Sequence, residues 1–376
     1  MTPAHRAVLI IALGYRPNIG GLETHLDDLT SYLAGQGVEV DVHTLQPITT
    51  PFKGPRLERR AHLTIHRYGW VGQGWFYQLA RVPVVGFLYS FPAMLMVAMR
   101  ARRNRAEIVY PQGLAAAAAS ALVFPRRRRC VALHSDIGFS SPLARRTVRG
   151  ILTSADAVLC LSERVCSQVG SLGIPPERVH RFRYWVDVKR FQPALRTSPS
   201  IAERSPGKFT VLFVGRLIPE KGVRLALDAA RTLADGDVEF LFAGTGPEER
   251  HIREFHGETP VRYLGAVTQD ALPALYSSAD VLLVPSPSQE GFGRVILEAM
   301  ACGTAIIAAR RGGIPEVVTP DIGLLVEPDV GEIVDAIRRL RSDPDTVVRM
   351  GAAARTRALA EYSDSNAEMI LRRLFP

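Results

Sequence analysis

The sequence predicts an α/β protein with two domains, each built on a doubly wound parallel sheet. Short runs rich in β-branched residues alternate with longer stretches of helical periodicity, which is typical of βαβ units. The same plan occurs twice in 376 residues, a length beyond the roughly 250–300 residues at which single hydrophobic cores stop growing. Residues 193–208, rich in serine and proline and without apolar periodicity, separate the two repeats.

Ten strands are expected, five in each repeat. In the first repeat they are residues 7–13, 38–45, 106–113, 130–136 and 157–163. In the second repeat they are residues 209–216, 238–246, 261–267, 279–286 and 304–310. The predicted domains are residues 1–193, a linker at 194–207, residues 208–360, and a final helix within 361–376.

Composition places the chain among ordinary soluble globular proteins. Apolar residues make up 47% and charged residues 22%, which excludes a disordered or fibrous protein. The four cysteines lack the spacing of a zinc site, so a reduced, cytoplasmic setting is expected. The apolar run at residues 7–13 ends near glycines and lacks a lysine-rich leader, so it is interpreted as a strand.

Residues 82–99 form an uncharged run followed by Arg100, Arg102, Arg103 and Arg105. The length is borderline for a membrane span. Two prolines and a polar flank favour instead a helix that is partly buried or lies on a membrane. The aromatic stretch at residues 70–78 precedes it and could lie at a lipid interface.

Positive charge is concentrated in the first part of the chain. Residues 1–193 carry 25 Lys and Arg against 12 Asp and Glu, whereas the remainder carries 21 against 25. Such asymmetry favours an anionic partner, which could be nucleic acid, an anionic membrane or a phosphorylated substrate. The alternative is a set of arginines spread over a solvated surface.

Three loops that follow predicted strands carry the candidate binding residues. In open α/β sheets, ligands bind beyond the carboxyl ends of the strands, where helix N-termini attract anions. The first loop contains Gly20 and Gly21, which let the backbone approach a phosphate before a helix begins. A glycine pair can equally serve only to reverse the chain.

The second loop places Arg216 at the end of the first strand of the second domain and Lys221 five residues later. A guanidinium fork and an ammonium group suit a diphosphate leaving group, because negative charge develops on it as its bond breaks. The alternative is a pair of exposed surface cations.

The third loop lies in the stretch SQEGFGRVILEAM, residues 288–300. Its turn consists of Gly291, Phe292 and Gly293. Helical side chains lean toward the helix N-terminus, so Glu298 can accept hydrogen bonds from a ribose bound over the helix start. Glu290, in the loop, would meet the transferred group. The alternative for Glu298 is a structural ion pair, because a carboxylate in an apolar helix is costly unless it is paired.

These motifs resemble those of retaining GT-B glycosyltransferases of the glycosyltransferase 4 type, over nearly the whole chain. The shared features are the two glutamates around GFG, GRLIPEKG upstream, GG near the N-terminus, and ACGTAIIAARRGGIPEVV downstream. The resemblance implies two Rossmann-like domains around an inter-domain cleft, with the final helix crossing back to the first domain. By this resemblance, Arg216 and Lys221 would bind the nucleotide diphosphate, Glu298 the ribose and Glu290 the donor sugar. Gly21 would approach the diphosphate from the first domain.

The resemblance also assigns His134 to a position near the donor sugar, although a core histidine is the alternative. It places base contacts around Gly265 and Val267, mostly through the backbone. Two departures stand out. Tyr184 and Trp185 replace the usual Asn-Gly before the linker, and Arg294 adds a cation directly after GFG.

The activity that the resemblance implies is transfer of a hexose from a UDP- or GDP-sugar to an acceptor hydroxyl by front-face displacement, with retention. No tightly bound metal or other cofactor is expected, because no Asp-x-Asp element follows a predicted strand. The acceptor would be a lipid-linked or envelope glycan at the cytoplasmic face of the membrane, reached by a peripheral protein. A soluble small molecule is the alternative acceptor.

Other functions remain as hypotheses. A GT-B nucleotide-sugar epimerase would use the same donor site. A phosphorylase is disfavoured because no lysine site for pyridoxal phosphate is evident. A nucleic-acid-binding protein is suggested by RRRR at residues 126–129, but the run lacks interleaved aromatic residues and a known binding module.

Overall fold

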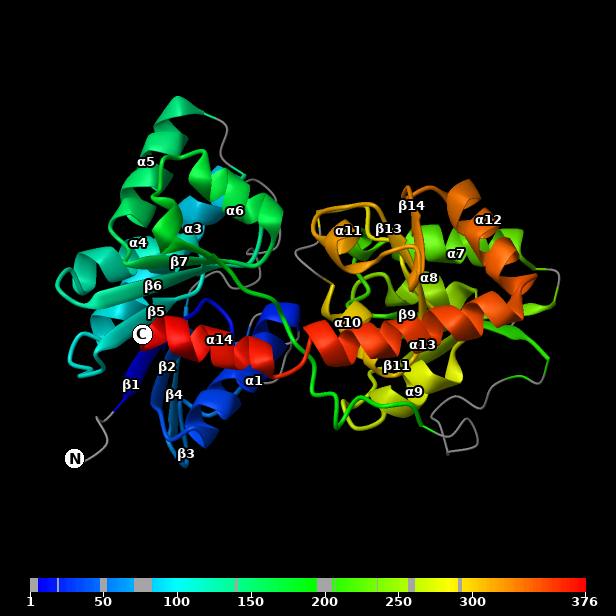
Figure 1. Cartoon of the computed structure of the whole chain (residues 1–376), viewed down its shortest axis with the longest axis horizontal. Coiled ribbons are helices and arrows are strands. Elements are labelled where there is room, and N and C mark those ends of the chain that lie inside the picture. Colours follow the sequence, from blue (N-terminus) through cyan, green and yellow to red (C-terminus); the bar gives the residue numbers. More distant parts are fainter. Residues whose placement is uncertain are drawn as a thin grey trace. The chain divides into compact units, whose positions relative to one another are not determined.

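The structure is a computed structural model that describes residues 6–18, 20–47, 53–70, 83–138, 141–194, 205, 207–234, 236–255, 261–289 and 293–376. It forms two compact units (Figure 1). The first unit comprises Met1–Arg183 and Ser365–Pro376, and the second comprises Tyr184–Asp364. Each unit contains one sheet with helices packed against it, as the α/β prediction requires.

The first unit has an eight-stranded sheet in the order β3-β4-β2-β1-β5-β6-β7-β8. All pairings are parallel except that of β3 with β4. The strands are β1 Ala7–Ile11, β2 Glu39–Leu45, β3 Leu57–Arg60, β4 Leu63–Tyr68, β5 Ile108–Pro111, β6 Arg128–Leu133, β7 Ala157–Cys160 and β8 Val179–Arg181.

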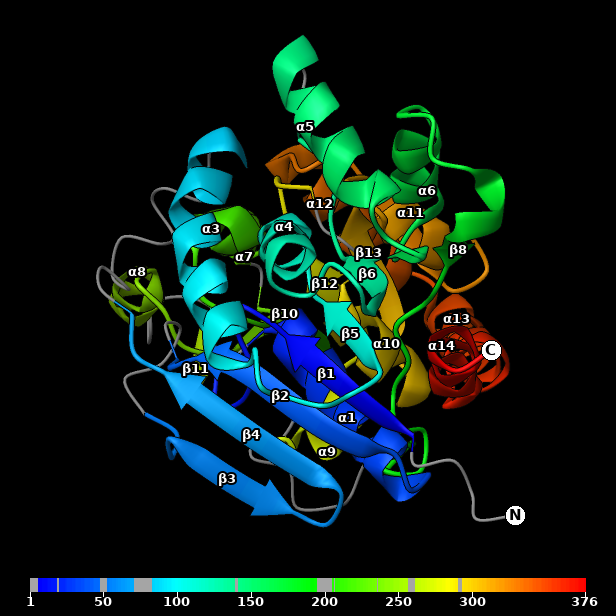
Figure 2. The same ribbon diagram turned by 90° about the vertical axis from the view of Figure 1, so that its left-hand side faces the viewer.

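Helices cover both faces of this sheet (Figure 2). They are α1 Gly21–Gly35, α3 Pro83–Arg100, α4 Leu114–Val123, α5 Pro142–Thr153, α6 Glu163–Gly170, the 3-10 turn η2 Pro176–Arg178, and α14 Ser365–Leu374. Helices α3 and α4 pack on each other and on one face, whereas α1 contacts β2, β4 and α14. Sequence-distant parts of the chain thereby share one core.

The second unit has a six-stranded parallel sheet in the order β11-β10-β9-β12-β13-β14. The strands are β9 Phe209–Val214, β10 Val238–Ala243, β11 Val261–Gly265, β12 Val281–Val284, β13 Ala305–Ala309 and β14 Gly323–Val326. The helical segments are η3 Pro219–Lys221, α7 Val223–Thr232, α8 Glu249–Glu254, α9 Leu272–Ser278, α10 Arg294–Ala301, α11 Ile314–Val317, α12 Val330–Arg341 and α13 Pro344–Glu361. Buried residues of α7 and α12 share one core with β9, β10 and β13.

All ten predicted strands are present, each within or close to its predicted range. Strands β3, β4, β8 and β14 were not predicted. The segment that forms β3 is LERR, which is charged and exposed, and β8 and β14 are only three and four residues long. Short or polar strands of this kind carry no recognisable run of β-branched residues.

Residues 184–193 belong to the second unit and not, as predicted, to the first domain. The second unit begins at Tyr184. Hydrogen bonds explain the division: the Val186 amide donates to the Tyr362 carbonyl (2.9 Å). The Arg355 guanidinium donates to the Phe191 carbonyl (2.8 Å). This segment is thus held by α13 and the residue that follows it.

The uncharged run at residues 82–99 forms α3, a partly buried helix as expected. Ala93, Met94 and Val97 are buried against the sheet. Val84 and Leu88 are exposed to 45% and 64%. Among the helices of the described residues, none combines the length and the apolar character needed to cross a bilayer.

Candidate active site

The second sheet reverses its strand order between β9 and β12, because β10 and β11 follow on one side of β9 and β12 lies on the other. In open α/β sheets, such a switch point opens a crevice at the carboxyl ends of the two strands. The loops that follow β9 and β12 carry two of the three predicted motifs. The structure therefore places both motifs at the expected end of adjacent strands.

The loop after β9 contains Arg216 and Lys221, which are both half-buried. It passes through the 3-10 turn η3 to Gly222, whose φ of 75° is left-handed. A side-chain carbon at Gly222 would collide with the carbonyl oxygen of Pro285, the first residue after β12. Glycine at position 222 therefore lets the loop after β9 contact the loop after β12. Arg216 and Lys221 lie in the first of these loops.

Gly265 ends the neighbouring edge strand β11, and its carbonyl accepts a hydrogen bond from the Gly244 amide (2.7 Å). Gly244 follows β10, and a side-chain carbon there would collide with the carbonyl of Gly215 after β9. Val267 is half-buried two residues beyond Gly265. The predicted base-contact segment is thus connected, loop to loop, with the segment that carries Arg216.

Helix α10 begins at Arg294, and Gly293 precedes it with a left-handed φ of 66°. A side-chain carbon at Gly293 would lie 2.8 Å from Ile296 Cδ1, so glycine suits this turn for both backbone and space. Glu290, Gly291 and Phe292 lie outside the described residues. Their predicted roles therefore stay predictions.

Glu298 is buried in α10, and both of its carboxylate oxygens have partners. Arg294 Nε donates to Oε1 at 3.2 Å, one helical turn earlier, and the Tyr276 hydroxyl donates to Oε2 at 2.8 Å. Both charged side chains are less than 10% exposed. Burial, with Glu298 nearby, raises the pKa of Tyr276 well above its usual value, so this hydroxyl keeps its proton and donates.

Arg294 was expected to add a cation near the anion site, but it is buried and paired with Glu298. Its guanidinium points into the unit, where Nη1 donates to the carbonyl of Trp185 at 3.2 Å. Trp185 is itself 4% exposed. The two departures from the family pattern, at positions 185 and 294, are in direct contact and stabilise the same buried cluster.

In the first unit, Gly20 and Gly21 lie at the start of α1, as predicted. The carboxylate of Glu23, in the first turn, occupies the space beside this start. A side-chain carbon at Gly20 would collide with one of its oxygens, and one at Gly14 would lie 2.6 Å from the other. A negative charge is favourable at a helix N-terminus. A phosphate that approached Gly20 would meet Glu23 unless that side chain turned away.

His134 follows β6, and its Nε2 lies 2.8 Å from Oε1 of Gln112, which follows β5. Its ring centroid lies 5.7 Å from that of His25 and 5.4 Å from that of Phe182. Desolvation by the surrounding protein lowers the pKa of His134 to about 3. The imidazole is therefore neutral at pH 7, where it can form hydrogen bonds but supplies no positive charge.

Sequence reasoning missed Gln112, Glu23 and Tyr276. Gln112 could have been found, because it lies at the carboxyl end of a predicted strand next to that of His134. Tyr276 could not, because it precedes Glu298 by 22 residues in a separate helix. Contacts of this kind depend on packing between helices that periodicity does not specify.

The arginine run at residues 126–129, which motivated the nucleic-acid hypothesis, is largely engaged within the first unit. Arg127 donates to the Asn104 carbonyl, and Arg128 Nη2 donates to the Arg373 carbonyl at 3.2 Å. Arg129 is 7% exposed and donates to the Phe124 carbonyl at 2.7 Å. Backbone carbonyls of the first unit thus bind three of these four arginines.

Comparison with protein families assigns both halves of the chain. Residues 19–190 match the family described as Glycosyltransferase Family 4, and residues 197–357 match the family described as Glycosyl transferases group 1. Together the two matches cover the first and second predicted domains.

Relatives of known activity extend over nearly the full length. A GDP-mannose-dependent alpha-(1-6)-phosphatidylinositol monomannoside mannosyltransferase of Mycobacterium tuberculosis is 30% identical, over 94% of this chain and 94% of that protein. A D-inositol 3-phosphate glycosyltransferase of Pseudarthrobacter chlorophenolicus is 29% identical, over 90% of this chain and 86% of that protein.

Solved structures share the fold. Sucrose-phosphate synthase from Thermosynechococcus elongatus aligns with a TM-score of 0.75 at 22% identity, over 99% of this chain and 98% of the other. An alpha,alpha-trehalose-phosphate synthase from Burkholderia xenovorans aligns with a TM-score of 0.76 at 14% identity, over 99% and 100%. Fold, family matches and full-length identity agree: the chain belongs to glycosyltransferase family 4 and is a glycosyltransferase with the GT-B fold.

Proposed function

We propose that this protein transfers a hexose from a nucleotide-diphosphate sugar to a lipid-linked acceptor at an anionic membrane surface, with retention at the anomeric carbon. The observation that carries the proposal is the contact between Gly222 and Pro285 at the switch point. It holds the loop of Arg216 and Lys221 against the loop that leads to α10. A diphosphate bound there would meet both cations.

The two cations would act on the leaving group. Negative charge develops on the diphosphate as the bond to the sugar breaks, and positive groups fixed in advance stabilise that charge without reorganisation. A guanidinium can form paired hydrogen bonds with phosphate oxygens, and an ammonium acts as a point charge. The departing diphosphate would assist deprotonation of the acceptor hydroxyl on the same face of the sugar, so the anomeric configuration is retained.

The names of the relatives support GDP-mannose as the first donor to test, with UDP-hexoses as the alternative. The mycobacterial relative is named as GDP-mannose-dependent and as acting on a phosphatidylinositol monomannoside. The second relative is named for D-inositol 3-phosphate. The first name favours a lipid-linked acceptor, and the second favours a soluble phosphorylated polyol.

Helix α3 supports the lipid-linked acceptor. Val84, Val85, Leu88 and Met99 are exposed apolar residues on this helix. Its last residue, Arg100, and the segment that follows it, with Arg102, Arg103 and Arg105, provide four exposed arginines. Apolar side chains beside a basic group suit a helix that lies at the headgroup level of an anionic bilayer. The aromatic stretch at residues 71–78 lies outside the described residues.

The test offers the purified full chain a panel of labelled GDP- and UDP-hexoses, with phosphatidylinositol mannoside vesicles or D-inositol 3-phosphate as acceptor. We expect the label in the lipid fraction. NMR of the product should show the same anomeric configuration as in the donor. Label only in the inositol phosphate fraction would favour the soluble acceptor. Inversion at the anomeric carbon would contradict the proposed displacement.

A further inference from the structure

A polar cluster interrupts the apolar face of the first sheet that α3 covers. Asp41 and His43 lie on β2, and His66 lies on β4 in register with His43. Side chains alternate along a strand, so Asp41 and His43 share a face. On the neighbouring strand β1 their partners are Leu9 and Ile11, which are buried in the apolar core beneath α3. Three ligand-type side chains thus gather where apolar residues would be expected.

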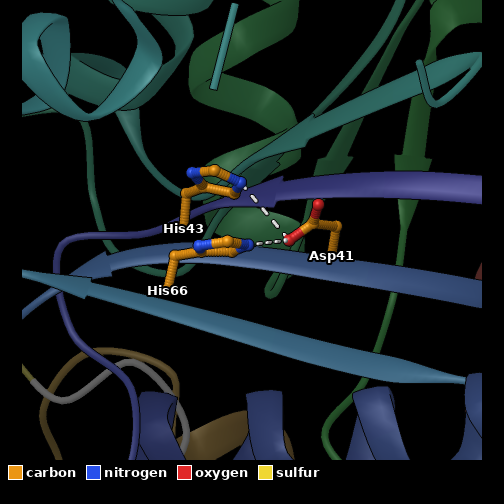
Figure 3. A group of neighbouring side chains, drawn as sticks. All are labelled: Asp41, His43 and His66. Atoms are coloured by element: carbon orange, nitrogen blue, oxygen red, sulfur yellow. Dashed lines mark ion pairs between the residues drawn. The ribbon is translucent and has the colours of Figure 1, made fainter. Parts of the chain in front are cut away.

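The imidazole rings of His43 and His66 are stacked, and each directs its Nε2 toward Oδ1 of Asp41 (Figure 3). Asp41 Oδ1 lies 3.3 Å from His43 Nε2 and 3.4 Å from His66 Nε2. All three atoms lie within 4.8 Å of one another. A tetrahedral zinc ion, with bonds of about 2.0–2.2 Å, separates its ligand atoms by about 3.3–3.6 Å. Two of the three separations therefore already suit such an ion.

The second polar atoms of His43 and Asp41 are held by other residues. His43 Nδ1 lies 2.8 Å from the Tyr68 hydroxyl, which leaves Nε2 to face Asp41. Asn104 Nδ2 donates to Asp41 Oδ2 at 2.6 Å, which leaves Oδ1 to face the imidazoles. Asn104 is itself fixed, because its Oδ1 accepts from the Ala106 amide at 2.8 Å. Metal-binding histidines and carboxylates are typically oriented by second contacts of this kind.

Exposure of the cluster allows an ion to enter from solvent. The side chain of His43 is only 5% exposed, whereas those of Asp41 and His66 are 27% and 31% exposed. A buried ligand fixes the site, and the two open ligands leave room for water as a further ligand. Within the described parts of the chain, no other group of His, Cys, Asp and Glu brings three ligand atoms together in this way.

We propose that Asp41, His43 and His66 bind one divalent transition-metal ion, with zinc as the best match to two imidazole nitrogens and a carboxylate oxygen. The bound ion would join β2 to β4 and stabilise the first unit. All three ligands belong to that unit, whereas Arg216 and Lys221 belong to the second. The metal proposal does not rest on the proposed transfer reaction.

The test uses the full chain, stripped with a chelator and then dialysed against zinc. We expect one zinc per chain by elemental analysis and a rise in Tm with added zinc, because an ion that binds the folded state stabilises it. Cobalt gives a second readout, since its visible absorption reports the coordination geometry. A wild-type chain that retains no zinc and shows no shift in Tm would overturn the proposal.

Variants identify the ligands. Asp41→Asn and His66→Gln should each weaken zinc binding at least tenfold. The matched control is His62→Gln, because His62 Nδ1 lies 2.6 Å from a Glu39 oxygen, so it is also a histidine paired with a carboxylate, but at an exposed position. This control should bind zinc as the wild type does.

Zinc affinity that is unchanged in Asp41→Asn and His66→Gln, or reduced equally in His62→Gln, would overturn the proposal. Circular dichroism of the zinc-free variants establishes that they fold. If Asp41→Asn fails to fold, the partly exposed His66 carries the test alone. A cluster that holds only a shared proton would give a Tm that depends on pH but not on zinc, which would also overturn it.

Discussion

Arg216 and Lys221 are the residues whose replacement most directly tests contact with the leaving group. Arg216→Ala and Lys221→Ala should each lower kcat about a hundredfold, the scale for losing one preorganised charge contact. Both residues are half-buried in a loop rather than in the core, so the fold should persist. Steady-state transfer of labelled hexose measures the effect.

The matched control is Arg338→Ala, which removes an exposed arginine of α12 whose carboxylate partner lies 3.9 Å away. This variant should keep wild-type kcat. Wild-type turnover in both Arg216→Ala and Lys221→Ala would refute the assignment of the diphosphate to this loop.

Two roles are possible for Glu298, a ligand of the ribose and a partner in a structural ion pair. Because its contacts are known, variants can distinguish the two roles. Glu298→Gln removes a charged acceptor and should weaken nucleotide binding about tenfold or more, since hydrogen bonds to charged groups contribute about 1.5–3 kcal/mol. Arg294→Lys keeps a positive charge but loses the guanidinium contact to Trp185. It should lower Tm while nucleotide affinity stays near the wild-type value.

Isothermal titration with the nucleotide diphosphate and thermal unfolding measure the two effects on the same samples. If Glu298→Gln lowers Tm but binds nucleotide as tightly as the wild type, Glu298 serves only the ion pair. Breaking a buried pair by removing one partner costs about 3–5 kcal/mol, so the effect on stability should be clear in either case.

At single positions, the sequence was a better guide to which residues are important than to which residues they contact. The four-residue spacing of Arg294 and Glu298 is the helical spacing of an ion pair, and this signal was available. That the Arg294 guanidinium would also reach Trp185 was not, because that contact joins segments 109 residues apart. The sequence therefore suggested two roles for Glu298, a ribose ligand and an ion-pair partner, but it did not show the contacts that bear on the choice between them.

Among the elements, strands with a continuous apolar run were predictable and short or polar ones were not. Strand β4 shows the reason, because its sequence LTIHRY alternates buried and half-buried positions, and its polar positions include His66. Polar residues on the face beneath α3 conceal a strand from an apolar pattern. Polar residues on this face also form the cluster of Asp41, His43 and His66, so the strand that was missed supplies one of the three proposed metal ligands.

Helix α3 makes a testable contribution at the scale of elements. Each arginine near an anionic surface contributes about 1 kcal/mol to binding, so a variant with Arg102, Arg103 and Arg105 changed to Gln should bind anionic vesicles about a hundredfold more weakly. These residues are exposed, so folding should be unaffected. Co-sedimentation with phosphatidylinositol-containing and with neutral vesicles measures the effect.

A matched variant changes Arg338, Arg339 and Arg341 of α12 to Gln, which removes the same number of charges from the second unit. It should bind vesicles as the wild type does, and wild-type binding should fall as salt increases. Equal partitioning to neutral vesicles, or to none, would leave the arginines near α3 as ordinary surface charge and favour the soluble acceptor.

At the scale of the whole molecule, the two units separate two kinds of positive charge. The proposed leaving-group cations, Arg216 and Lys221, are side chains of the second unit. The proposed metal ion would be held by β2 and β4 of the first unit. If fixed side chains supply the charge at the diphosphate, then removal of metal ions should affect stability and transfer activity differently.

We therefore expect EDTA to lower the Tm of the zinc-loaded chain while kcat is retained at temperatures below the unfolding transition. The loss in Tm follows because the ion binds the folded state, and kcat is retained because Arg216 and Lys221 need no metal to carry their charge. In Asp41→Asn, EDTA should change neither quantity. Complete loss of transfer in EDTA that magnesium or manganese restores, in a chain whose fold persists by circular dichroism, would show that a metal ion and not the two side chains neutralises the leaving diphosphate.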